Sequence, residues 1–143
     1  RDLHSFPTRR SSDLVGVRER MQLSAKENFI ATRKGVTDFG ALSDAEKRAK
    51  IAEDPSFGQI VCRCEMITEG QIKEAIHRPL GARSMDAVKR RTRAGMGRCQ
   101  AGFCTPKTMA LLAQEWGIPI TAITKKGGRS QMLVGHTKTF AEA

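Results

Sequence analysis

The sequence predicts an all-α fold: a small helical domain with one short extended segment and flexible ends. Three observations predict this class. Between residues 68 and 117, apolar residues recur at helical spacing in three stretches, each with a capping residue at its start. Only residues 58–64 have the short, β-branched composition of a strand. Aromatic residues are sparse, with six Phe, one Trp and no Tyr, so the core is expected to be modest.

Length and composition limit the class of protein. A chain of 143 residues is long enough for one domain with appendages. The formal net charge of +10 favours an anionic partner, without choosing among nucleic acid, lipid, an acidic protein face or an anionic metal centre. No apolar run reaches the length of a transmembrane helix, and no secretory signal is present. We therefore expect a reducing, cytoplasmic location, where closely spaced cysteines hold metal more often than they form disulfides.

Residues 1–14 are expected to be an assembly artefact. They show no hydrophobic period, no helix cap and no targeting pattern. At every position they match the translation of one reading frame of a common sequencing-library adapter. If an adapter adjoins Val15, we expect the natural protein to continue upstream, which makes residues 15–57 the tail of a missing domain together with a linker.

A first helix is expected over residues 43–52, within the linker. Ser43 is its cap, Glu46 completes a capping box, and Asp54 followed by Pro55 ends it. One face carries only small apolar residues: Ala45, Ala49 and Ala52. Because an alanine face buries little surface, we expect this helix to be largely solvated.

The first two cysteines lie in the extended segment. Side chains of a strand alternate between its faces, so Cys62 and Cys64 are expected to point to the same side while Arg63 points away. Two ligands of one site require this arrangement. We place the start of the domain at residue 58 and its end at residue 126.

Two helices are expected between the cysteine pairs. Thr68 begins the first, with Gln71 at the capping-box position, and Pro79 ends it. Its buried stripe comprises Ile72, Ala75 and Ile76. Ser84 caps the second helix, which ends at Gly95. Its inward residues are Met85, Val88 and Thr92, and its outer face carries Lys89, Arg90, Arg91 and Arg93.

A third helix is expected directly after the second cysteine pair. Thr105 and Pro106 occupy its cap and first-turn positions, and Gly117 lies beyond its end. Its inward residues are Met109, Leu112, Ala113 and Trp116. A short last turn is expected within residues 118–124, and residues 127–143 are expected to be a flexible tail.

The four cysteines are arranged as two halves of one site. One residue separates Cys62 from Cys64, and four separate Cys99 from Cys104. Each pair precedes the start of a helix, whose partial positive charge and unpaired amide groups favour an anionic centre. The backbone could approach the sulfurs closely at three glycines: Gly95, Gly97 and Gly102. We therefore expect all four thiolates to bind one metal or iron-sulfur centre.

Disulfides and zinc are the alternatives to an iron-sulfur cluster. Disulfides are disfavoured because a bridge across one residue is strained and no secretory context is present. Four inert cysteines would not fall by chance into two tight pairs. A structural zinc module is the stronger alternative, although zinc-binding pairs are usually spaced by two to four residues. Clusters accept more varied spacings, so the spacing favours a cluster and leaves zinc open.

Four stretches around the cysteines resemble one known family. They are residues 60–65 (Ile-Val-Cys-Arg-Cys-Glu), 68–70 (Thr-Glu-Gly), 90–97 (Arg-Arg-Thr-Arg-Ala-Gly-Met-Gly) and 99–104 (Cys-Gln-Ala-Gly-Phe-Cys). Together they resemble the BFD-like (bacterioferritin-associated ferredoxin-like) [2Fe-2S] domain. More narrowly, they resemble the version at the carboxy end of FAD-dependent oxidoreductases similar to the anaerobic glycerol-3-phosphate dehydrogenase large subunit. The resemblance extends from about residue 38 to residue 126.

The resemblance implies that Cys62, Cys64, Cys99 and Cys104 hold a [2Fe-2S] cluster in a small helical fold. It implies one-electron transfer, from the reduced flavin of an upstream FAD domain, through the cluster, to a partner subunit or a quinone. It carries over no substrate-binding or flavin-binding residue, so this piece alone is expected to lack the catalytic domain. The implied location is the cytoplasm, with attachment to the inner membrane only through a partner.

The basic run of residues 89–98 raises a second alternative, a cationic interaction domain for nucleic acid or protein. A capped helix with four cations can imitate a recognition helix, but base-reading residues and interleaved aromatics are absent. We expect an exposed cationic face and no nucleic-acid binding. His77 and His136 are expected to be ordinary surface residues.

Overall fold

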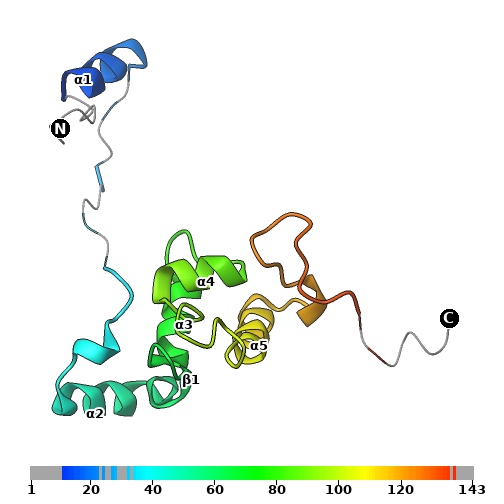
Figure 1. Cartoon of the computed structure of the whole chain (residues 1–143). Coiled ribbons are helices and arrows are strands. Elements are labelled where there is room, and N and C mark those ends of the chain that lie inside the picture. The colour runs from blue at the N-terminus through cyan, green and yellow to red at the C-terminus, as the bar shows by residue number, and fades with distance from the viewer. Residues whose placement is uncertain are drawn as a thin grey trace, which may run out of the picture. The chain divides into compact units, whose positions relative to one another are not determined.

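The computed structural model describes residues 11–22, 24, 27–28, 32, 34–135 and 137, and the chain divides into two units. Unit 1 spans residues 1–34 and unit 2 spans residues 35–143. Helix α1 (Ser11–Arg20) belongs to unit 1 (Figure 1). Residues 1–10 of the expected artefact lie outside the described residues, as do His136 and residues 138–143 of the expected tail.

Unit 2 is mostly helical and contains one small sheet (Figure 1). Its elements are, in chain order, η1 (Phe39–Ala41), α2 (Asp44–Glu53), η2 (Pro55–Gly58), β1 (Ile60–Cys62), β2 (Ile67–Thr68), α3 (Glu69–His77), α4 (Met85–Thr92), α5 (Thr105–Trp116) and η3 (Ile120–Ala122), where η marks a 3-10 helix. A mostly helical domain is therefore confirmed. The narrower prediction of an all-α fold did not include the second strand.

The two strands pair antiparallel, with Ile60 opposite Thr68 and Cys62 opposite Ile67. A strand of two residues is too short to show an alternating pattern, so β2 could not be predicted from periodicity. Its extended backbone follows from the helix that comes next. Thr68 caps α3 with φ −88° and ψ 163°, and a cap residue of this kind lies in the β region.

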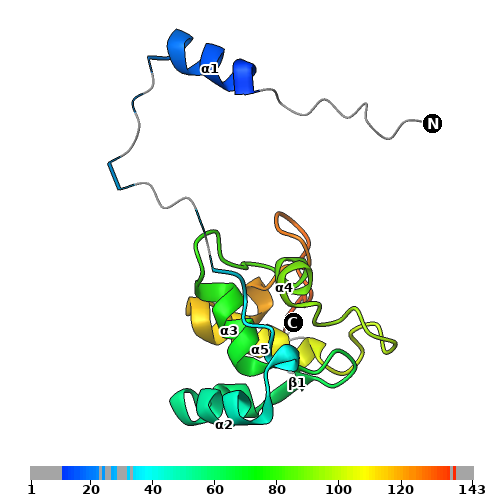
Figure 2. The ribbon, with the colours of Figure 1, turned by 90° about the vertical axis from the view of Figure 1, so that its left-hand side faces the viewer.

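The core of unit 2 forms where α3 packs against both α4 and α5. Its largest fully buried side chains include Ile72 and Ile76 on α3, Val88 on α4 and Leu112 on α5. Helix α2 lies at the edge of the unit in both views (Figures 1 and 2). None of the helices within the described ranges is both long enough and apolar enough to cross a membrane.

The predicted helix starts are confirmed at three positions. Ser43 and Glu46 form a capping box at α2, in which the Ser43 amide donates to the Glu46 carboxylate at 2.8 Å. Thr68 and Gln71 form the second box at α3, and Ser84 caps α4 with its side chain. No residue of α2 is buried, so the prediction of a solvated helix is also confirmed.

Helix α4 ends earlier than predicted. Its closing residue is Arg93, in the left-handed region at φ 67°, whereas Gly95, at φ 87°, lies in the turn beyond. The Arg93 amide donates to the Lys89 carbonyl and so completes the last helical turn. A left-handed arginine is costly and cannot be predicted from local propensity.

Helix α5 begins at Thr105, and its cap is Cys104 rather than Thr105. The Thr105 hydroxyl donates to the Ala101 carbonyl at 2.6 Å instead of accepting from an amide of the first turn. Gly117 closes the helix at φ 60°, as predicted. The correction matters because it places a cysteine at the amino end of the helix.

The segment after α5 folds back onto the domain. The predicted short turn is η3, and beyond it Thr124 pairs with Gln131 in an isolated antiparallel bridge. The Met132 amide donates to the Ile123 carbonyl at 3.1 Å. Residues 124–132 therefore contact the domain through backbone hydrogen bonds.

Candidate metal centre

The four cysteines come from four places in unit 2 and line one pocket. Cys62 ends β1, Cys64 lies in the turn that follows, Cys99 lies in the loop after α4, and Cys104 is the cap of α5. The pocket has a volume of about 600 Å³, and the rest of its lining is apolar or cationic. The structure therefore brings all four predicted residues together.

Within the pocket, the thiols form two close pairs. Cys64 is in hydrogen-bonding contact with Cys99, Cys62 is in hydrogen-bonding contact with Cys104, and all four are free of disulfides. In the described part of the chain, no three His, Cys, Asp or Glu side chains gather closely enough to hold a single metal ion. Two thiol pairs that line one pocket could together supply the four ligands of one metal or iron-sulfur centre.

The first cysteine pair is only half in a strand. Cys62 ends β1 and is 1% exposed, whereas Cys64 is exposed and lies in a turn that contains Met66 at φ 53°. The expectation that strand alternation points both thiols to one side is therefore wrong in its geometry. Both sulfurs still reach the same pocket because the turn curls the chain around it.

Gly97 permits the close approach that was predicted for it. A β-carbon at this position would lie 2.2 Å from the β-carbon of Cys64, and real side chains do not reach such a distance. The other two glycines act less directly. Gly95 supplies a left-handed turn, and a β-carbon at Gly102 would lie 3.2 Å from the Cys99 carbonyl oxygen.

The Cys99 sulfur is surrounded by hydrogen-bond donors. The hydrogen bond from Cys64 lowers the pKa of Cys99, and the backbone amides of Phe103, Ala101 and Gly102 lower it further. The amides converge because two non-glycine residues of this loop, Gln100 and Ala101, have positive φ angles. Such a nest of amides stabilises a thiolate. It was not predicted from the sequence, because Gln and Ala carry no signal for left-handed backbone.

The surroundings of Cys104, unlike those of Cys99, disfavour the thiolate. Burial raises the pKa of its thiol to about 11, and the neighbouring Cys62 adds to the effect. Its residue is 4% exposed. A buried thiol of this kind loses its proton when a metal cation supplies the compensating charge. The four cysteines thus differ in exposure, and Cys99 and Cys104 differ in the charge that their surroundings favour.

An ion pair joins the two cysteine loops. Arg93 Nε donates to Glu65 Oε2 at 2.8 Å, and the Glu65 side chain is 19% exposed. Glu65 directly follows Cys64, while Arg93 closes α4 on the way to Cys99. The pair therefore holds the first loop against the second. From the sequence, Arg93 was expected to be one of four equivalent cations on an outer face.

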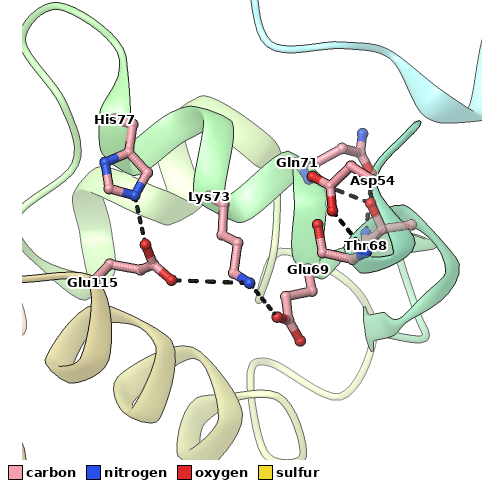
Figure 3. A network of polar contacts seen from close by, with 8 residues as sticks. Asp54, Thr68, Glu69, Gln71, Lys73, His77 and Glu115 are labelled. Carbon is pink, nitrogen blue, oxygen red and sulfur yellow. Dashed lines mark hydrogen bonds and ion pairs between the residues drawn. The ribbon is translucent and has the colours of Figure 1, made fainter. Parts of the chain in front are cut away.

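A second polar network joins α3 to α5 away from the cysteines (Figure 3). His77 Nε2 lies 2.5 Å from Glu115 Oε2, and Lys73 Nζ lies 3.9 Å from Glu115 Oε1 and 2.7 Å from Glu69 Oε1. The bond with Glu69 raises the pKa of Lys73. None of these side chains lines the cysteine pocket, so the network supports helix packing. The half-exposed His77 side chain agrees with its prediction as a surface residue.

Comparison with known proteins places this pocket in a family. The model of the BFD-like [2Fe-2S] binding domain matches residues 60–114, which contain all four cysteines. A glycerol 3-phosphate dehydrogenase of Caloramator mitchellensis is 51% identical over 118 residues, which cover 82% of this chain and 25% of that protein. A subunit of the anaerobic glycerol-3-phosphate dehydrogenase of Escherichia coli (strain K12) is 36% identical over 74 residues, or 52% of this chain and 13% of that protein.

One relative has a different name. The hydrogen cyanide synthase subunit HcnB of Pseudomonas aeruginosa is 31% identical over 84 residues, which cover 57% of this chain and 18% of that protein. The chain thus spans about a quarter or less of the length of these curated relatives. No solved structure matches the chain.

The family match, the dehydrogenase relatives and the pocket formed by the four cysteines agree with one another. Residues 60–114 are a BFD-like [2Fe-2S]-binding domain, homologous to the C-terminal part of glycerol-3-phosphate dehydrogenase subunits.

Proposed function

We propose that this chain is the C-terminal electron-transfer domain of a larger FAD-dependent dehydrogenase, in which Cys62, Cys64, Cys99 and Cys104 hold a [2Fe-2S] cluster. The observation that carries the proposal is that all four thiols line one pocket inside the matched segment. When bound, the cluster supplies one-electron transfer. The protein around it supplies the thiolates, the hydrogen bonds to sulfur and the access of a partner.

The residues of the pocket suit this task in different ways. The exposed Cys64 gives the site an open side, whereas Cys62 and Cys104 are buried and close its inner side. The amides around Cys99 favour negative charge at that sulfur. Hydrogen bonds of this type also raise the reduction potential of a cluster, because they stabilise the added electron.

The names of the relatives support a proposal for the activity of the parent protein. Several are glycerol-3-phosphate dehydrogenases or subunits of these enzymes, so we assign the parent the oxidation of glycerol 3-phosphate. An upstream FAD domain would receive the electrons from the substrate and pass them singly to the domain described here. A partner subunit or a quinone would accept them, either in the cytoplasm or at the inner membrane through that partner.

Electron uptake tests the function of the domain. The chain is purified without oxygen and titrated with dithionite while its visible absorption is recorded. We expect a brown protein that bleaches as it takes up about one electron per chain. Cys62→Ser and Cys104→Ser should each abolish the uptake, whereas Thr105→Ser, which keeps the hydroxyl that binds Ala101, should leave it unchanged. A colourless protein that holds metal and takes up no electron would instead support a structural zinc module.

The parent assignment has its own test. Sequencing the genomic locus upstream of Val15 should show a reading frame that continues into a dinucleotide-binding domain with a glycine-rich strand-to-helix turn. If the locus encodes residues 1–14 as they stand, the artefact is contradicted, and a frame without a dinucleotide-binding domain upstream contradicts the parent assignment.

A further inference from the structure

The mouth of the cysteine pocket is cationic and partly apolar. Arg63, Arg98 and Lys107 line it, all three are exposed, and no carboxylate is among the lining residues. Phe103 is 84% exposed and Ile60 is 41% exposed at the same place. We call these five residues the cationic rim.

The charge of the cationic rim is not neutralised by the domain. Several other cations of unit 2 have acidic partners, among them Lys73 with Glu69, Arg93 with Glu65 and Lys125 with Asp86. Others, such as Arg90 and Arg129, are in no ion pair within the described residues. Among the residues that the structure describes, no ion pair includes Arg63, Arg98 or Lys107. Positive charge therefore faces solvent around the opening.

Part of this positive charge would balance the negative charge of a bound cluster. Charge balance does not explain why the Phe103 ring is exposed. The backbone amide of Phe103 donates to Cys99, while its ring remains almost fully exposed. An exposed aromatic ring that lines the same pocket as three cations resembles the centre of a protein interface, where aromatic residues and arginine are enriched. A second groove of about 230 Å³ shares Ile60 and Lys107 with the rim, and its lining is mixed, with Leu111 of α5 beside the polar residues Gln59, Glu69 and Gln114.

We propose that the cationic rim is the docking surface through which this domain exchanges electrons with an acidic protein surface that surrounds a second redox centre. The inference rests on the proposed function, since it names the kind of partner that uses the cluster. Charge complementarity identifies the partner: three unpaired cations attract carboxylates, and a second copy of this chain would be repelled. The small apolar centre suits the weak, transient contact of electron-transfer proteins.

A matched pair of electron acceptors tests the sign of the partner. Cytochrome c is basic, and succinylation of its lysines makes it acidic while the haem stays the same. The full chain with its cluster is reduced with dithionite and mixed with each oxidised acceptor in a stopped-flow instrument. One electron passes from the reduced cluster to the ferric haem, with no change in bonding. At low salt we expect the succinylated form to react at least about tenfold faster, and this advantage should disappear at high ionic strength.

Charge reversal locates the contact. The double variant Arg98→Glu with Lys107→Glu should slow the reaction with succinylated cytochrome c about tenfold and accelerate the reaction with the native form. The matched control is Arg90→Glu with Arg129→Glu, which changes the net charge equally at exposed positions outside the pocket lining. We expect the control to stay within about twofold of the unaltered chain. If the double variant loses its cluster, Lys107→Glu alone is tested instead, because Lys107, unlike Arg98, is not next to a cysteine in the sequence.

The results of these experiments distinguish a failure of the proposed function from a failure of the proposed docking surface. A chain without iron and sulfide contradicts the proposed function. A chain that takes up an electron but reduces both cytochromes at similar, salt-independent rates retains the proposed function and overturns the docking surface. Equal loss of rate in the rim variant and the control variant also overturns it, because net charge would then explain the effect. If a single-stranded oligonucleotide binds the rim more tightly than succinylated cytochrome c does, nucleic acid is the occupant and the proposal fails.

Discussion

Gly97 and Cys64 lie so close that a β-carbon on residue 97 would come within 2.2 Å of the β-carbon of Cys64. The two residues belong to different cysteine loops, separated by α3 and α4. Their contact is one of the points at which the loops touch. Any side chain at position 97 must push the first loop outward, and with it the exposed thiol.

Gly97→Ala is therefore expected to impair the site. Moving Cys64 away from Cys99 should lower cluster occupancy by at least about half, and the overpacking should reduce the free energy of unfolding by about 1–3 kcal/mol. Iron analysis and thermal unfolding measure the two effects. Gly35→Ala is the matched control, since a β-carbon there meets nothing within 4 Å. Full occupancy in Gly97→Ala would show that the loops do not need this contact.

Cys99→Ala should remove the colour of the protein and also destabilise it. The main core is small, and a bound cluster ties the loop after α4 to the turn after β1. We expect the thermal midpoint to fall by about 5 °C or more, measured by circular dichroism under anaerobic conditions. An unchanged midpoint in a colourless variant would mean that the fold does not depend on the cluster.

Gly70→Ala tests the fold apart from the site. A β-carbon on Gly70 in α3 would lie 2.4 Å from the ring of Phe57, a residue of η2 that is 2% exposed. We expect a loss of about 1–3 kcal/mol in the free energy of unfolding. Combining it with Phe57→Leu should cost less than the sum of the two single changes, because the smaller side chain relieves the clash. Simple additivity in urea unfolding would contradict the contact.

The Ser43–Glu46 capping box predicts a pH dependence. Hydrogen bonds from the Ser43 hydroxyl and amide lower the pKa of Glu46 in the folded state. A lowered folded pKa means that the stabilisation is fully present above the unfolded pKa and is lost as the pH falls through the folded pKa. An NMR titration of the Glu46 carboxyl carbon should show the low midpoint in the unaltered chain. Ser43→Ala should raise it, and an identical midpoint in both proteins would refute the box.

Local signals predicted the helix starts well, because a cap is decided by a few neighbouring residues. Ser43, Thr68 and Ser84 are caps in the structure as they are in the sequence. The left-handed Arg93 and the shift of the α5 cap to Cys104 were not predicted. Both depend on contacts that local propensity does not contain: Arg93 binds Glu65 across 28 positions, and Thr105 turns its hydroxyl to Ala101.

At the candidate site, too, some features were predicted from the sequence and others were not. Spacing and resemblance identified the cysteines, and the structure brings all four to one pocket. The amides around Cys99 and the unpaired cations of the rim became visible only in three dimensions. The amides converge because two consecutive residues, Gln100 and Ala101, have positive φ angles. The cations of the rim are unpaired because the carboxylates of the unit lie elsewhere, as Glu65 does beside Arg93.

The content of the pocket tests the central claim most directly. Iron, zinc and acid-labile sulfide are measured in the anaerobically purified chain, relative to protein determined by amino-acid analysis. We predict about two irons and two sulfides per chain and no stoichiometric zinc. One zinc per chain with no sulfide would contradict the cluster assignment, and so would a chain that holds neither metal nor sulfide.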